Sequence, residues 1–161
     1  MELPKYDLDL TIKKQFSKTN NKLINKETYN NLQFGTKAHQ ILELLDFKNP
    51  NWSLIEDNFL KNKIKKFLEQ PLLKKLNQAN IYKEYEFIFE QDCVKYHGII
   101  DLILEYPDYI DIIDYKLKEI QDENYIKQLT SYQNYIKKIT NKPVYIYLYS
   151  LISENMERIE S

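Results

Sequence analysis

The stretch "GIIDLILEYPDYIDIIDYK", residues 98–116, places a Tyr-Pro-Asp-Tyr turn between two apolar runs rich in isoleucine. Runs of β-branched and aromatic residues on either side of a short turn predict two antiparallel strands. Three charged residues, Asp101, Asp114 and Lys116, interrupt these runs at positions where a buried strand normally excludes charge. Charges in such places need a chemical reason.

The turn fixes how these charges face one another. If it is centred between Pro107 and Asp108, Asp101 pairs with Asp114 across the two strands, with Cβ atoms roughly 5 Å apart. Lys116 lies two residues beyond Asp114 and projects from the same face. Facing carboxylates destabilise a sheet unless a positive charge compensates them. Lys116 could neutralise one of them as an ion pair, or a divalent cation such as Mg²⁺ or Mn²⁺ could take both.

The rest of the chain predicts one α/β domain with a mixed sheet. Residues 1–30 are polar and are expected to form a loosely ordered arm, and residues 31–161 form the domain. Apolar residues three and four apart predict helices at 32–47, 52–69 (with Phe59 in its apolar stripe) and 123–139, with Pro71 ending the second helix or starting a short one through Leu76. Alternating patterns predict strands at 81–90, 94–106, 109–117 and 143–151. The helix between the last two strands makes them parallel neighbours.

Composition narrows the class of protein. The 161 residues are 43% hydrophobic and can bury a real core, and a net charge of -1 gives no global basic excess that would announce a nucleic-acid partner. The single Cys93, to which no role is assigned, excludes an internal disulfide and a four-cysteine zinc or iron–sulfur site within this chain. Nothing resembles a signal peptide or a membrane span, so a cytoplasmic location is expected.

Four sequence blocks together resemble the PD-(D/E)XK nuclease superfamily. Asp101 followed by "DYK" (114–116) resembles its acid and acid-x-Lys signature. "GTKAHQILELLDF" (35–47) resembles the Gly-Thr-x-x-His helix of RecB-type nucleases, and "YKEYEF" (82–87) the strand before their first aspartate. "QLTSY" (128–132) resembles their Gln-x-x-x-Tyr helix. The residues of these blocks and their order along the chain look most like the C-terminal nuclease domain of the AddA subunit of bacterial ATP-dependent helicase–nucleases.

The resemblance implies a restriction-endonuclease-like αβββαβ core and a set of site residues. The implied ligands of Mg²⁺ or Mn²⁺ are His39, Asp101, Asp114 and the backbone carbonyl of Tyr115. Lys116 would be the catalytic lysine. Gln128 and Tyr132 would line the site, and Glu84, with Glu86 as the alternative, would be the acid of the first strand. Taken alone, His39 on an apolar helix would more simply be a core residue, and its place in "GTKAH" is what favours a ligand.

The implied activity is hydrolysis of DNA by a metal-dependent nuclease, as an exonuclease on single-stranded ends in DNA repair or recombination. No G-x-x-x-x-G-K-[ST] loop is present, so the isolated chain should act without ATP. DNA and a helicase subunit or domain are the implied partners. A non-catalytic DNA-binding or helicase-tethering module of the same fold is the alternative, and an endonuclease with the same chemistry is a third possibility.

Two groups of lysines could follow a phosphate backbone or could form ordinary solvated faces. One group is Lys61, Lys63, Lys65, Lys66, Lys74 and Lys75, and the other, in the arm, is Lys13, Lys14, Lys18, Lys22 and Lys26. His97, on a predicted strand beside Gly98, is expected to be structural or at the surface.

Overall fold

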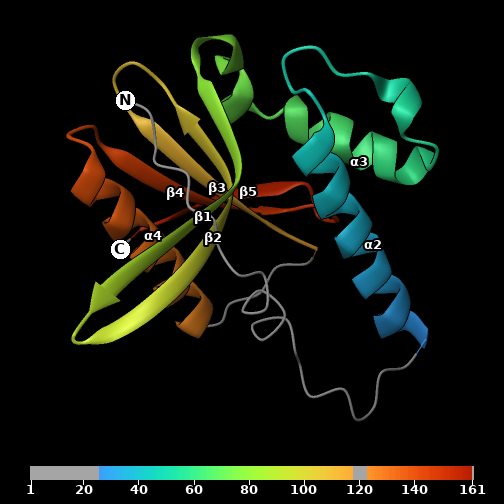
Figure 1. Cartoon of the computed structure of the whole chain (residues 1–161). Helices are drawn as coiled ribbons and strands as arrows, with labels where there is room; N and C mark the ends of the chain where they lie inside the picture. Colours follow the sequence, from blue (N-terminus) through green and yellow to red (C-terminus); the bar gives the residue numbers. More distant parts are fainter. Residues whose placement is uncertain (1–25, 118–122, 161) are drawn as a thin grey trace.

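A computed structural model describes residues 26–117 and 123–160. Helices α2 and α3 lie on one side of a five-stranded sheet and α4 lies on the other (Figure 1). The helices are α2 (Lys26–Leu44), α3 (Asn58–Leu68) and α4 (Glu123–Ile139). The strands, in their order across the sheet, are β1 (Asn80–Gln91), β2 (Val94–Glu105), β3 (Ile110–Lys116), β4 (Val144–Ser150) and β5 (Asn155–Ile159). The predicted mixed sheet flanked by helices is therefore confirmed.

The connections between strands set the register of the sheet. Strands β1 and β2 form a hairpin whose turn residues, Asp92 and Cys93, both have positive φ (53° and 65°), as a type I′ turn requires. In the next turn the N–H of Tyr106 donates to the carbonyl of Tyr109 (2.9 Å). Leu102 then pairs with Ile113, which is the predicted register. Strands β3 and β4 are parallel, as the helical crossover between them predicts.

Two hydrophobic cores cover the two faces of the sheet. The core beneath α2 and α3 contains Leu42, Ile64, Phe67, Leu102 and Leu104, all at most 1% exposed. The core beneath α4 contains Phe87, Ile103, Leu129, Ile136 and Ile146, all 0% exposed. Each such side chain contributes about 1.5–3 kcal/mol through burial, so both helical layers are held by their apolar stripes.

The β1–β2 hairpin exchanges its two faces partway along its length. Ile81 and Leu102 pack against the α2 and α3 core, whereas Tyr85 and Ile100 belong to the α4 core. Alternate residues of a regular strand share one face, so both strands rotate between these positions. On β1 the rotation coincides with Glu84, which has a left-handed backbone (φ 48°). The hairpin therefore crosses from one layer of the protein to the other at this point.

The helices differ from the prediction at their ends. Helix α2 begins at Lys26, so residues 26–30, expected in the arm, are helical, while the rest of that expected arm lies outside the described residues. Helix α3 begins only at Asn58, because the Asp57 side chain caps it by accepting from the Leu60 N–H (3.0 Å). Phe59 is 55% exposed, so its predicted place in the buried stripe was wrong. In the part of the chain that the structure describes, no helix has the length and hydropathy to cross a membrane.

Shorter elements fill the remaining gaps. Single 3-10 turns form at Trp52–Leu54, Pro71–Leu73 and Leu76–Gln78, so the predicted helix at Pro71 is two short turns. Strand β5 was not predicted. Its sequence, "NMERI", has two buried or half-buried apolar residues among three exposed polar ones, too few for a clear alternating pattern.

Gly98 lies where the β1–β2 hairpin packs closely against helix α4. The ring of Phe87 lies directly over Gly98 and stacks on Tyr135 of α4, with ring centroids 4.3 Å apart. A Cβ atom at position 98 would overlap that ring. The same ring meets Tyr132 edge to face at 5.4 Å. The absence of a side chain at position 98 thus lets the hairpin and α4 approach closely.

We predict opposite effects for alanine at the two glycines of the chain. Gly98→Ala should destabilise the protein by about 1–3 kcal/mol, because Phe87 must leave its stacked position. Gly35→Ala, in the interior of α2 with no atom within 4 Å of the added Cβ, should stabilise it by up to about 1 kcal/mol. Urea unfolding followed by circular dichroism measures both. Equal effects of the two substitutions would contradict the packing described for Phe87.

Asp111 is a buried carboxyl without a hydrogen bond. It lies in the middle of β3, is 1% exposed, and neither of its oxygens has a partner among the described residues. Burial raises the pKa of Asp111 to about 7, although the positive charge of Arg158 acts to lower it. The nearby Glu105 is also buried, but its carboxylate accepts from Tyr82 and lies 3.5 Å from Lys142. Asp111 is therefore a buried acid whose charge no hydrogen bond among the described residues compensates.

Folding stability should fall as pH rises through the titration of Asp111. The folded pKa lies above the unfolded value, so the favourable contribution is complete below about pH 4 and is lost as pH rises through about 7. The loss should be on the order of 2–4 kcal/mol. Asp111→Asn and Asp111→Leu should both flatten this pH dependence, with the leucine variant the more stable. The control is Asp108→Asn, at an exposed acid, which should keep the pH dependence of the wild type. If the free energy of unfolding changed equally between pH 4 and 8 in all variants, Asp111 would not be the group responsible.

Candidate functional site

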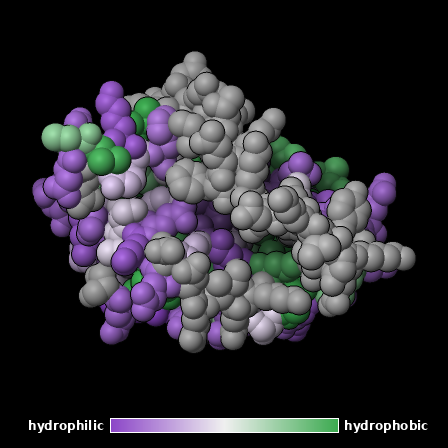
Figure 2. Space-filling view, turned by 90° about the horizontal axis from the view of Figure 1, so that it is seen from below, coloured by the Kyte–Doolittle hydropathy of each residue, from purple (hydrophilic) through white to green (hydrophobic). Residues whose placement is uncertain are grey.

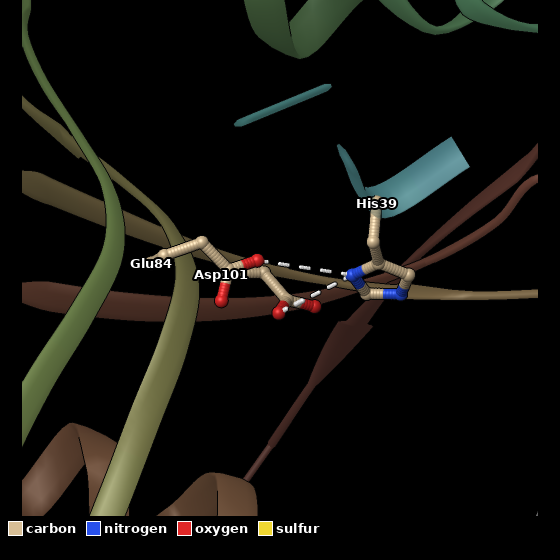
Figure 3. A group of neighbouring side chains, drawn as sticks. All are labelled: His39, Glu84 and Asp101. Carbon is tan, nitrogen blue, oxygen red and sulfur yellow. Dashed lines mark ion pairs between the residues drawn. The ribbon is translucent and has the colours of Figure 1, made fainter. Parts of the chain in front are cut away.

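Three side chains from three elements converge where the hairpin changes faces (Figure 3). His39 of α2 points its Nδ1 at Asp101 Oδ1 of β2 (3.6 Å) and at Glu84 Oε1 of β1 (3.9 Å). One ligand atom from each residue lies within 4.8 Å of the other two. The group combines one imidazole nitrogen with carboxylate oxygens.

The sequence around each residue explains why they meet. Ala38 of α2 is fully buried against the sheet, which places the neighbouring His39 at the margin of the core, edge-on to the ring of Tyr115 (5.6 Å). Glu84 reaches the group through its left-handed backbone, which costs about 1–2 kcal/mol in a residue with a Cβ. Such strain at a cluster of charged side chains is typical of functional sites. Glu86, the alternative acid, is not part of this group.

The two aspartates of the opening stretch interact electrostatically. Asp101 Oδ2 accepts from the N–H of Tyr115 (2.9 Å), the residue that follows Asp114 on β3. Burial, and then the charge of Asp101, raise the pKa of Asp114 well above its usual range. Burial also raises the pKa of Asp101, against the opposing charge of His39. One proton held on Asp114 relieves the repulsion, and a bound cation would do the same.

The surroundings of His39 favour its charged form. Burial acts to lower the pKa of His39, but the carboxylates of Glu84 and Asp101 outweigh it, so the pKa is raised. The imidazolium thus balances the acids when no metal is bound. Because a metal ligand must be deprotonated, binding of a cation here should release this proton.

A cavity of about 180 Å³ opens beside the acid pair. Its walls are His39, His97, Ile99, Asp101, Asp114, Tyr115, Lys116, Tyr125, Gln128 and Tyr132. Lys116 Nζ lies 3.8 Å from Asp114 Oδ2, so the ion pair left open by the sequence is present. Gln128 Nε2 donates to the Tyr132 hydroxyl (2.6 Å). The structure therefore brings His39, Asp101, Asp114, Lys116, Gln128 and Tyr132 to one cavity, with Glu84 at its edge.

Three residues of this wall were not predicted as site residues: His97, Ile99 and Tyr125. His97 was expected to be structural or at the surface, yet it is half-buried and lines the cavity. It precedes Asp101 by four residues on β2, and the alternation of a strand could have placed it on the same face. Tyr125 lies three residues before Gln128, which puts both on one face of α4. The helical period was the signal that could have identified it.

The predicted DNA-contact lysines lie apart from this cavity. None of Lys61, Lys65, Lys66, Lys74 and Lys75 is among its wall residues. Lys63 donates to Glu154 (3.0 Å) and to the Ile152 carbonyl, so it ties α3 to the segment before β5. Lys65 lies over the ring of Trp52. Lys26 starts α2, and the other arm lysines lie outside the described residues. Contact with DNA stays a prediction for all of these lysines.

The sequence matches the family model of the PD-(D/E)XK nuclease superfamily over residues 12–158. This match covers most of the chain, and the chain belongs to that superfamily. The fold and the order of the acid and acid-x-Lys positions agree with the membership.

Two individual proteins are similar to this chain over different lengths. It is 31% identical over 101 residues to an ATP-dependent helicase/nuclease subunit of Clostridium beijerinckii, a match that covers 58% of this chain and 8% of that protein. The chain thus spans a small part of that relative's length. The crystal structure of a protein proposed to be an exonuclease, from Eubacterium rectale, aligns with 84% of this chain and 57% of that one, at 13% identity and a TM-score of 0.47.

The donor atoms present suit a hard divalent cation. The donor group contains two carboxylates, and carboxylate oxygens are typical ligands of Mg²⁺ and Mn²⁺. Glu84 joins the predicted ligands His39, Asp101 and Asp114 as a candidate. A ligand role for the Tyr115 carbonyl stays a prediction.

Removal of His39 should weaken metal binding more than it weakens the fold. We expect His39→Ala to lower Mn²⁺ affinity at least about tenfold in calorimetric titrations without DNA. The side chain is 37% exposed, so the melting temperature should change little. Titrations in two buffers of different ionisation enthalpy should show that fewer protons are released on binding in the variant than in the wild type.

The matched control is His97→Ala, in the same cavity wall but outside the donor group. It should leave Mn²⁺ affinity within about twofold. Unchanged Mn²⁺ affinity in His39→Ala, together with a sharp fall in melting temperature, would assign His39 to the core instead.

Proposed function

We propose that the chain is a metal-dependent deoxyribonuclease that hydrolyses phosphodiester bonds. The observation that carries this proposal is that Asp101 and Asp114 line one cavity together with Lys116, whose ammonium lies 3.8 Å from Asp114 Oδ2. Membership of a nuclease superfamily supports the same reaction. An ion pair alone would account for Lys116 and Asp114, but it gives no reason for the second aspartate, for Glu84 or for His39.

The residues divide the chemistry among them. Asp101, Asp114, His39 and Glu84 would hold Mg²⁺ or Mn²⁺, which when bound polarises the scissile phosphate and lowers the pKa of a coordinated water. Lys116 orients the attacking water or stabilises the negative charge that builds on the phosphate. Gln128 and the Tyr132 hydroxyl offer a hydrogen-bonded pair of polar groups to the phosphate or to Lys116.

The proposed substrate is single-stranded DNA near an end, in DNA repair or recombination. The partial similarity to a helicase/nuclease protein supports a helicase subunit or domain as the partner that presents the strand. The described part of the chain offers the lysines of α3 and of the turns after it as contacts to the phosphate backbone. Without a phosphate-binding loop for ATP in the sequence, cleavage by the isolated chain should not require ATP. A cytoplasmic location is part of this proposal.

Two substitutions test the enzyme assignment. Asp114→Asn keeps the size of the side chain but loses the charge that binds a hard cation, and Lys116→Ala removes the ammonium. Each should lower cleavage of end-labelled single-stranded DNA in Mn²⁺ at least about 100-fold. DNA binding in EDTA should stay within a few fold, because phosphate contacts dominate that affinity. Asp108→Asn, at an exposed acid of the β2–β3 turn, is the control and should cleave normally.

Linear and circular substrates extend the same assay. Cleavage of linear strands with circles left intact supports an exonuclease, and cleavage of both supports an endonuclease. If the wild-type chain binds DNA but cleaves neither form in Mg²⁺ or Mn²⁺, the enzyme proposal fails and a binding module remains.

A further inference from the structure

The ammonium of Lys116 has two close neighbours of different kinds. One is Asp114, whose Oδ2 lies 3.8 Å from Nζ. The other is the aromatic face of Tyr125, whose ring centroid also lies 3.8 Å from Nζ. Lys116 is 29% exposed in its side chain, so both neighbours act on a partly desolvated charge. The lysine is therefore held between a carboxyl group and a ring.

A bound cation would change only one of these two contacts. Once Asp114 binds a divalent ion, the ion compensates the charge of Asp114 and weakens its attraction for the ammonium. The attraction of the ring comes from its quadrupole and is not neutralised by the ion. The ring is then the neighbour that still holds the ammonium in place.

We propose that Tyr125 is a positioning residue that keeps the Lys116 ammonium directed into the cavity while Asp114 is engaged with a metal ion. The proposal rests on the proposed nuclease function. Tyr125 lies in the first turn of α4, on the face that also carries Gln128 and Tyr132, so one helix face supplies the wall opposite the acids.

The hydroxyl group of Tyr125 takes no part in this role. It is buried, and it has no hydrogen-bond partner among the residues that the structure describes. The ring face alone makes the contact with Lys116. Phenylalanine should therefore replace Tyr125, whereas an aliphatic residue of similar size should not.

Kinetics on single-stranded DNA in Mn²⁺ provide the first test. Tyr125→Leu should lower kcat about 10- to 100-fold, because a misplaced catalytic group has effects of this size, while KM and the Mn²⁺ midpoint stay within about threefold. Tyr125→Phe should keep kcat within about twofold of the wild type. The control is Tyr96→Leu, at a 44% exposed tyrosine of the hairpin outside the cavity wall, which should not change kcat. A Tyr125→Phe variant as slow as Tyr125→Leu would overturn the proposal.

A spectroscopic test separates this proposal from the nuclease assignment. An ammonium over an aromatic face places the adjacent ε-methylene protons in the shielding region of the ring, so their NMR signals should move upfield. The signal is assigned by its loss in Lys116→Arg. It should stay upfield in Tyr125→Phe and when Mg²⁺ is added, and return to the ordinary position in Tyr125→Leu. A normal position in the wild type with Mg²⁺ would overturn the proposal even if the chain cleaves DNA. An upfield position in a chain that cleaves nothing would overturn only the nuclease function.

Discussion

Repulsion between two carboxyl groups on neighbouring strands is the constraint on which the rest of the site depends. The β2–β3 ladder ends at the pair Leu102 and Ile113, and Asp101 and Asp114 are the next residues beyond it, both lining the same cavity. Such a pair survives only if protons, cations or hydrogen bonds compensate it. His39, Lys116 and the Tyr115 N–H each supply part of that compensation. On the face drawn in Figure 2, hydrophilic side chains make up much of the coloured surface, with hydrophobic side chains among them.

The sheet and its register could be predicted because local rules agree there. The Tyr-Pro-Asp-Tyr turn and the alternation in residues 98–116 both favour the same pairing, and the crossover helix leaves one orientation for β4. Helix ends were less predictable. The start of α3 depends on the Asp57 cap, whereas the apolar spacing around Trp52 and Phe59 looked equally helical. Periodicity identifies an element, and single side-chain bonds decide where it ends.

The sequence could not decide whether Glu84 or Glu86 belongs to the site, and only the folded structure separates them. Glu84 and Glu86 lie on the same strand at similar distances from Asp101 in the chain, and no rule of alternation separates them. The left-handed backbone at Glu84, where the hairpin changes faces, brings this acid to His39. The helical period could have placed Tyr125 on the face of Gln128, but its contact with the Lys116 ammonium depends on how α4 packs against β3, which the folded structure supplies.

The donor atoms of the site come from three elements, α2, β1 and β2, so a bound cation would connect them. A cation held by His39, Glu84 and Asp101 would act as a cross-link between α2 and the β1–β2 hairpin, closing a loop that no disulfide can close in a chain with one cysteine. Metal binding would then stabilise the packing of α2 against the hairpin, since a ligand that binds only the folded state stabilises that state. In a cell, the availability of the ion would set how firmly α2 is fastened to the sheet.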